Sequence, residues 1–164
     1  MAETTDEPEA PPSAPNEPVD AKDPLTKQDF EELARFRFGI RRYLRFSEET
    51  VRRHGLTPQH YQLMLALKGF PGRDWAVVRE LADRLQLRHH SVVELVNRAQ
   101  KQDLVERAPD PADARVVRVQ LTAGGERALA RLSALHRDEL RRLGAALTLP
   151  IWDEPSDNGS GGEG

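Results

Sequence analysis

The 164-residue chain contains no cysteine, which excludes disulfides, thiolate metal ligands and thiol redox switches. Its formal net charge of −3 hides an asymmetry, because residues 1–24 carry a net −6 and residues 150–164 a net −4, whereas residues 25–149 carry 23 bases and 16 acids, a net +7. The overall sign therefore does not exclude a nucleic-acid partner, since the basic middle is the part that would be steered toward phosphates.

Both ends of the chain are predicted to be disordered tails. Residues 1–24 are acidic, Pro-rich and nearly free of large apolar groups, and residues 150–164 share this bias, so neither can bury enough surface to offset ordering entropy. The acidic start is unlike a signal peptide, and no apolar run approaches the roughly 20 residues that span a bilayer. We therefore expect one domain, residues 25–149, in a cytoplasmic protein without membrane contact.

The first predicted element is a long helix from Thr26 to about His54, which Gly55 is placed to end. Its apolar residues recur at three- and four-residue spacing, and arginines occupy the opposite face. A second helix is expected from Thr57, because threonine suits the N-cap and Pro58 the first helical position. This second helix is expected to be buried, because its apolar residues are too dense for an exposed one. They are Tyr61, Leu63, Met64, Leu65 and Leu67.

A helix–turn–helix pattern follows a short strand predicted at Trp75 to Val78. The first helix of the pair is expected over Arg79–Leu85 and the second over His89–Lys101, with Gln86 to Arg88 as the turn. The second helix has an apolar stripe for burial and an opposite polar face. The stripe consists of Val92, Leu95, Val96 and Ala99.

Two short β-branched segments, Leu104–Ala108 and Val116–Leu121, predict a hairpin whose loop holds two prolines. Thr122 is placed to cap a final helix that extends to about Leu147. Leucines form one stripe along that helix, and His136 falls in a gap of the stripe. The leucines are Leu129, Leu132, Leu140, Leu143 and Leu147.

This order of elements predicts a mainly α fold with a small β wing, a winged helix–turn–helix. The DNA-reading core is expected over about residues 57–121, and the long helices over about 26–54 and 122–147 lie outside it. Their apolar faces exceed what a small winged helix needs, so we interpret the surplus as a homodimer interface. A two-fold dimer would present two recognition helices to half-sites on the order of 34 Å apart.

The stretch LADRLQLRHHSVVELVNRAQKQDLVERAPDPADARVVRVQLTAGGERAL resembles the MarR family of bacterial transcription regulators. It has the family's pattern of helix, recognition helix, "GLV-x-R" strand, "DPxDxR" wing and "LTxxG" helix start, and the resemblance covers about residues 25–147. It implies a homodimer that binds an inverted repeat in double-stranded promoter DNA. Most members repress, and many release DNA on binding a small, frequently aromatic or phenolic anion.

Three positions depart from the family pattern. Arg88 stands where a capping Ser or Thr is frequent, so the recognition helix either starts differently or uses Arg88 on phosphate. Glu94 replaces a basic or small polar residue, so no operator sequence is carried over. Asp103 replaces a common glycine, which calls the usual left-handed cap at that helix end into question.

The first turn of the recognition helix is the part that enters the major groove in such proteins. Arginine reaches guanine edges or phosphate, and serine reaches either. The alternative is a polar, solvated helix start. Adjacent histidines on a helix point about 100° apart, so they are not interpreted as a metal pair. The DNA-contacting candidates of this turn are Arg88, His89, His90 and Ser91.

Four further residues are candidates for the DNA interface. Glu94 either accepts from a cytosine amino group or is a solvated acid. Arg98, one turn further, either binds phosphate or forms an ion pair within the domain. Arg115 at the wing is expected to enter an adjacent minor groove, against the alternative of a solvated charge. The resemblance suggests that Asp113 positions Arg115 by an ion pair, whereas Asp110 fits turn formation and needs no further role.

An effector site is implied by the resemblance alone, near the junction of the dimerisation helices and the DNA-reading core. Arg41 is the candidate for a ligand carboxylate, and Tyr43 and Tyr61 are candidates for aromatic walls, although core packing is the stronger interpretation of the tyrosines. The histidines outside the DNA-reading unit lack a close carboxylate cluster, so no metal is expected. His136 is expected at the dimer interface.

No catalytic constellation or cofactor motif appears, and Gly124-Gly125 is interpreted as a helix start rather than a phosphate loop. The sequence therefore predicts a DNA-binding regulator and not an enzyme, most simply a homodimeric repressor relieved by a small ligand. Two alternatives remain open. One is a ligand-independent activator or architectural regulator, and the other is a winged-helix protein-interaction module.

Overall fold

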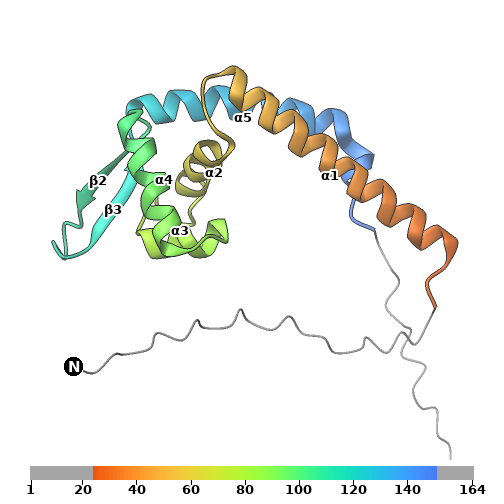
Figure 1. Cartoon of the computed structure of the whole chain (residues 1–164), viewed down its shortest axis with the longest axis horizontal. Helices are drawn as coiled ribbons and strands as arrows, with labels where there is room; N and C mark the ends of the chain where they lie inside the picture. Colours follow the sequence, from red (N-terminus) through yellow and green to blue (C-terminus); the bar gives the residue numbers. More distant parts are fainter. Residues whose placement is uncertain (1–23, 151–164) are drawn as a thin grey trace, which may run out of the picture.

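The computed structural model describes residues 24–150, so the predicted tails lie outside the described residues apart from their inner ends. Two long helices, α1 (Lys27–Arg53) and α5 (Ala123–Leu143), cross at one side of a smaller helical unit with a hairpin beside it (Figure 1). This mainly helical architecture with a small sheet confirms the predicted fold class. Within the described part of the chain, no helix is long and apolar enough to cross a membrane.

The smaller unit contains three helices and three short antiparallel strands in the order β1-β3-β2. Its core is formed by the inward faces of the helices and by Ala76 and Val119, which are paired across the sheet. The predicted stripe of the second helix of the pair is fully buried, as expected. The elements are α2 (Pro58–Lys68), β1 (Trp75–Ala76), α3 (Val78–Leu85), α4 (His89–Lys101), β2 (Val105–Pro109) and β3 (Val117–Leu121).

Three of the helices begin at threonine caps, of which Thr57 and Thr122 were predicted. The Thr26 hydroxyl accepts from the Asp29 amide at 3.3 Å, and the Asp29 carboxylate accepts from the Thr26 amide at 2.6 Å, which is a capping box. Thr57 accepts from the His60 amide at 3.2 Å, and Thr122 accepts from the Gly125 amide at 3.0 Å. Each side chain satisfies a backbone donor that a helix start leaves free, so these boundaries are fixed locally.

Left-handed residues end three of the helices. Gly55 has φ +75°, Gln86 has φ +53° and Asp103 has φ +54°. At Asp103 the next amide, of Leu104, donates back to the Ala99 carbonyl at 3.0 Å, which completes a Schellman motif. The usual left-handed cap is therefore present without glycine, because aspartate tolerates this conformation better than most residues.

Three boundary or burial predictions were wrong. The final α-helix ends at Leu143, and a 3₁₀ turn, η1 (Gly144–Leu147), replaces its predicted last turn. β1 stops at Ala76, because the Val77 amide is already capped at 2.9 Å by the Glu80 carboxylate and starts α3. Leu65 of the buried helix α2 is 47% exposed.

The turn at η1 folds the chain back onto α1. The approach is so close at Gly39 that an added Cβ would lie 2.8 Å from the Ala146 carbonyl carbon. A side chain at position 39 would therefore push η1 away from α1.

Candidate nucleic-acid interface

The turn between α3 and α4 presents the first turn of α4 to solvent. Gln86 takes the left-handed conformation, and the Leu87 amide then donates to the Ala82 carbonyl at 3.1 Å. Arg88 occupies the N-cap position in an extended conformation, and its side chain makes no capping hydrogen bond. Although Arg88 replaces the Ser or Thr that is frequent at this position, α4 still begins at His89, as predicted. The Arg88 side chain is exposed to solvent.

The candidate residues of α4 lie on the face opposite its buried stripe. Arg88, His89 and His90 are exposed and Ser91 is half-buried. The first turn of α4 holds no acidic residue, so its positive helix dipole is not offset by an acidic side chain there. Further along, Glu94 and Arg98 are also exposed, and this face therefore mixes both signs of charge.

Sequence reasoning missed a clamp on the far half of α4. Arg107 of β2 donates to the Gln100 side chain at 2.6 Å and to the Asn97 side chain at 2.9 Å. The clamp connects the recognition helix to the sheet that carries the wing. The "GLV-x-R" resemblance contained this arginine, but nothing local in the sequence identified its partners.

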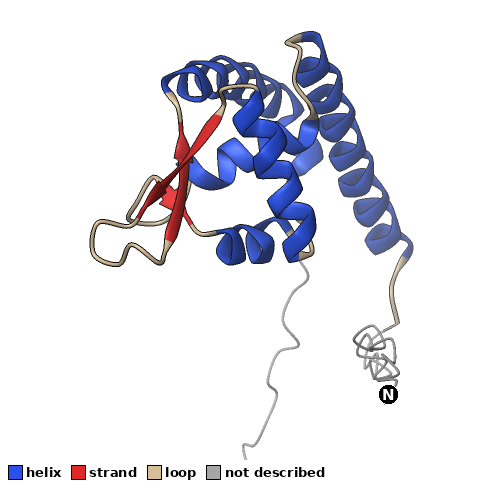
Figure 2. Cartoon of the chain, turned by 60° about the vertical axis from the view of Figure 1, so that its left-hand side comes forward, coloured by secondary structure: helices blue, strands red, loops and turns tan. Residues whose placement is uncertain are grey.

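The wing is a loop that projects beyond β2 and β3 (Figure 2). Asp110 organises it, because one carboxylate oxygen accepts from the amides of Ala112 at 2.7 Å and Asp113 at 3.2 Å. The other oxygen accepts from the Arg118 guanidinium at 2.5 and 2.6 Å. The Ala112 amide and Arg118 hold the pKa of Asp110 below its ordinary value. Asp110 therefore has more than the simple turn role predicted for it.

At the tip, Arg115 extends into solvent with its side chain 91% exposed. One oxygen of the Asp113 carboxylate accepts from both the amide and the Nε of Arg115, each at 3.1 Å. Asp113 thus orients the guanidinium while leaving most of it accessible. An exposed ion pair of this kind contributes little to stability, so its effect is mainly on orientation.

A stack of arginine and aromatic side chains connects the wing to the helix–turn–helix. The Arg118 guanidinium lies 3.8 Å from the centroid of a Trp75 ring, and Arg73 lies 4.0 Å from the Trp75 ring. Arg73 and Arg84 then approach the Phe70 ring at 4.2 and 4.3 Å. Such contacts are worth about 0.5–2 kcal/mol each. No local pattern pairs Arg84 and Arg118 with these rings, because the two arginines come from α3 and β3.

The candidate effector residues are only partly brought together. Tyr61 is buried and stacks on His136 with ring centroids 4.3 Å apart, and Tyr43 meets the same histidine edge-on at 6.0 Å. Burial raises the pKa of both tyrosines. Arg41 is exposed on α1. The tyrosines therefore contribute to packing within the chain.

His136 was expected at the dimer interface, but the structure buries it within one chain. It is 2% exposed, its Nδ1 donates to the Leu132 carbonyl at 2.6 Å, and its Nε2 lies 2.8 Å from the Ser47 hydroxyl on α1. It joins α1, α2 and α5 of one chain. Among residues 24–150, no three His, Asp or Glu side chains are grouped so as to hold a metal ion.

Comparison with known proteins finds a family match for part of the chain. Residues 54–116 match the model of the MarR family. The uncharacterized HTH-type transcriptional regulator YsmB of Bacillus subtilis (strain 168) is 34% identical over 85 residues, which are 48% of this chain. The matched part spans 58% of the length of YsmB.

Solved structures extend the likeness to the long helices. AbsC, a MarR family transcriptional regulator from Streptomyces coelicolor, has a TM-score of 0.62 at 21% identity over 77% of this chain and 84% of its own. A mutant of MepR from S. aureus, bound to an oligodeoxyribonucleotide, has a TM-score of 0.58 at 18% identity over 76% of this chain and 86% of its own. These likenesses confirm the winged-helix fold.

Proposed function

We propose that this chain is a winged helix–turn–helix transcription regulator of the MarR family, that it binds double-stranded promoter DNA as a homodimer, and that it represses transcription. The observation that carries the proposal is the pairing of two exposed basic elements. The first turn of α4 presents Arg88 without an acid beside it, and the wing presents Arg115, oriented by Asp113. A recognition helix suits the major groove, and an arginine on a wing suits the minor groove.

Phosphate contacts should dominate the affinity, so it is expected to fall steeply with salt. The test is fluorescence anisotropy with DNA from the region upstream of the gene, against a scrambled duplex, across a salt series. Tighter binding to the native region would support a sequence-specific regulator. Equal binding to both duplexes, or a flat salt dependence, would refute it.

Arg115→Ala is expected to weaken DNA binding about tenfold, equivalent to about 1.4 kcal/mol, with the larger loss at A·T-rich flanks because a narrow minor groove attracts arginine. The same anisotropy assay measures it. Arg137→Ala is the matched control, because that arginine is also exposed but lies on α5. If both variants lose the same DNA affinity, the wing does not contact DNA.

The homodimer is supported by apolar side chains that a single chain leaves in solvent. Phe30 and Phe38 on α1 are 55% and 54% exposed, and Leu140 on α5 is 42% exposed. Light scattering after gel filtration should give twice 18.5 kDa. The double variant Phe30→Glu, Phe38→Glu should be monomeric, because it places charges in a buried apolar interface. Val117→Glu, at an exposed apolar residue of the hairpin, is the control that should stay dimeric.

Repression and release by a small ligand complete the proposal and rest on the family. Arg41, Tyr43 and Tyr61 remain the effector candidates named from the sequence. A cytoplasmic location is part of the same proposal, because the promoter DNA of a bacterial regulator lies there. A reporter gene behind the upstream region should become more active when this gene is deleted, and unchanged or lower expression would argue for an activator.

A further inference from the structure

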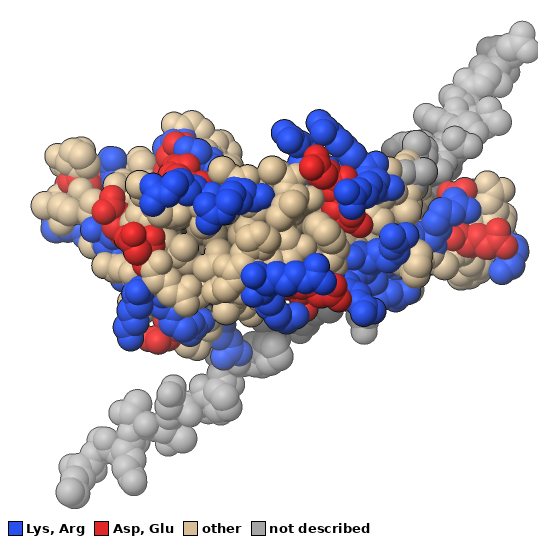
Figure 3. All heavy atoms as spheres, turned by 90° about the horizontal axis from the view of Figure 1, so that it is seen from above, with Lys and Arg blue, Asp and Glu red and all other residues tan. Residues whose placement is uncertain are grey.

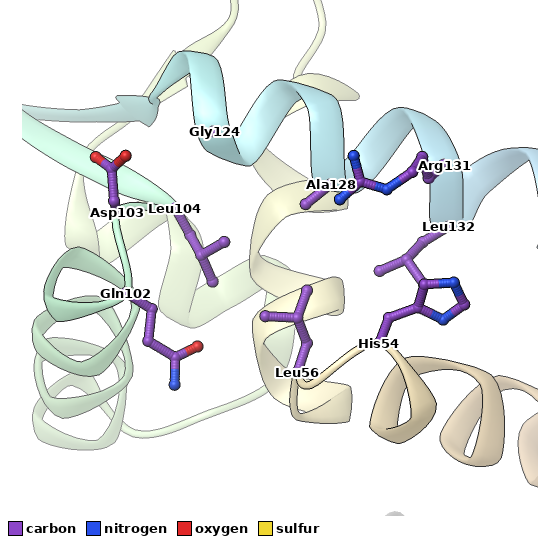
Figure 4. A pocket seen from close by; sticks show the side chains of 9 residues that line it. All are labelled: His54, Leu56, Gln102, Asp103, Leu104, Gly124, Ala128, Arg131 and Leu132. Atoms are coloured by element: carbon purple, nitrogen blue, oxygen red, sulfur yellow. The ribbon is translucent and has the colours of Figure 1, made fainter.

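A pocket of about 250 Å³ opens where the ends of α1 and α4 meet α5 (Figure 4). Its volume lies below the roughly 300–1,000 Å³ of sites for drug-sized ligands, so it suits a small metabolite. Side chains of Leu56, Leu104 and Leu132 form an apolar middle. Seen from above, the molecule shows basic and acidic side chains interspersed on its surface (Figure 3).

The two ends of the pocket carry opposite charges. Arg131 and His54 lie at one end, and Asp103 and Gln102 lie at the other, with the leucines between them (Figure 4). The His54 ring is held by its Nδ1, which donates to the Thr50 carbonyl at 2.8 Å. This hydrogen bond fixes the orientation of the His54 ring at the end of the pocket that holds Arg131.

Neither charge is neutralised by a neighbour in the described part of the chain. Arg131 and Asp103 are both exposed, and neither forms an ion pair there. Asp103 lies beside Gly124, and Arg131 follows Gly124 by seven positions, about 10 Å along the helix, so the two side chains lie at opposite ends of the pocket (Figure 4). The gap between the two charges is the apolar middle of the pocket.

We propose that this pocket binds a small zwitterion whose carboxylate and ammonium groups are separated by an apolar chain. The carboxylate pairs with the Arg131 guanidinium, the chain covers the leucines, and the ammonium lies against the Asp103 carboxylate. Each charge of such a ligand meets its opposite, whereas a simple carboxylate or amine would satisfy only one end.

Occupancy would be coupled to the recognition helix, a consequence that rests on the proposed function. Gln102 and Asp103 form the C-terminal cap of α4, so a ligand that holds them against α5 also fixes the C-terminal end of the helix whose first turn is the candidate DNA contact. A ligand that changes DNA affinity must have its own affinity changed by DNA by the same factor.

The test is a titration of the ¹⁵N-labelled full chain, without DNA, with 6-aminohexanoate, hexanoate and hexylamine, followed by amide chemical shifts. We expect saturable shifts at Asp103, Leu104 and Gly124 with 6-aminohexanoate, and at least tenfold weaker binding of the other two. Arg131→Gln and Asp103→Asn should each weaken 6-aminohexanoate at least tenfold. Asparagine is chosen because it tolerates the left-handed backbone at position 103.

Arg137→Gln, an exposed arginine of α5 outside the pocket, is the matched control and should bind as the wild type does. Absence of saturable shifts, equal affinity for the three probes, or undiminished binding by Arg131→Gln would overturn the proposal. DNA anisotropy is recorded separately. If the chain binds the zwitterion but not DNA, the pocket proposal stands and the proposed function is refuted. If it binds DNA but not the zwitterion, the proposed function stands and the pocket proposal is refuted.

Discussion

Replacing Gly125 by alanine is expected to lower the free energy of unfolding by about 3 kcal/mol. An added Cβ would lie 2.9 Å from the Leu104 carbonyl carbon and well inside contact distance of its oxygen. These are backbone atoms and cannot rotate away as a side chain would. The sign is opposite to that expected in an open helix, where alanine is more stable than glycine by about 1 kcal/mol.

The neighbouring contacts explain why the strain cannot be relieved cheaply. The Leu104 carbonyl accepts from the Thr122 amide at 3.1 Å, and the Thr122 hydroxyl donates to the Asp103 carbonyl at 2.5 Å. The end of α4 and the start of α5 are thus joined by two hydrogen bonds at the point where the Cβ would be inserted. Moving α5 away would break them.

Urea unfolding followed by circular dichroism measures the effect on the midpoint and the slope. Arg127→Ala is the control, because it changes an exposed side chain two residues further along α5 and should alter stability by less than about 0.5 kcal/mol. If Gly125→Ala unfolds at the same midpoint as the wild type, the close approach of the two backbones is not as described.

The features that could be predicted from the sequence are local ones. Thr57 and Thr122 were identified as caps because a cap is satisfied within three residues of itself. The bounds of α4 also followed from its 3.6-residue apolar period and were predicted correctly, from His89 to Lys101. Propensity and periodicity act over one or two turns, so one sequence contains enough information to apply them.

The features that could not be predicted depend on contacts between distant segments. Asp110 looked like an ordinary turn residue, because its partner Arg118 and the Trp75 ring beneath that guanidinium belong to two other strands. The end of α5 at Leu143 likewise depends on η1 packing against Gly39, more than one hundred residues earlier. Asp103 was expected to disfavour a left-handed cap, because the family's usual glycine is absent there. The hydrogen bonds at the end of α4 nevertheless hold Asp103 in the left-handed conformation.

His60→Leu is expected to stabilise the chain by about 1–2 kcal/mol at neutral pH. His60 is 2% exposed on α2, and neither of its ring nitrogens has a hydrogen-bond partner in the described part of the chain. A buried polar group without a partner costs about 1–3 kcal/mol, which a leucine of similar volume avoids. Equilibrium urea unfolding at neutral pH gives the difference directly, and a less stable His60→Leu would mean that the nitrogens are satisfied after all.

The same residue predicts a pH dependence with a definite sign. Burial, and then the nearby charge of Arg98, lower the pKa of His60 below its ordinary value of 6.5. As the pH falls through about 6.5, the unfolded chain takes up a proton that the folded chain refuses, so stability is lost, at most about 1.4 kcal/mol per pH unit. His60→Leu should remove this loss between about pH 7 and 5.5, where most carboxylates do not yet titrate. His89→Gln, at an exposed histidine, should retain the wild-type slope, and equal slopes in all three proteins would mean that His60 titrates alike in the folded and unfolded chain.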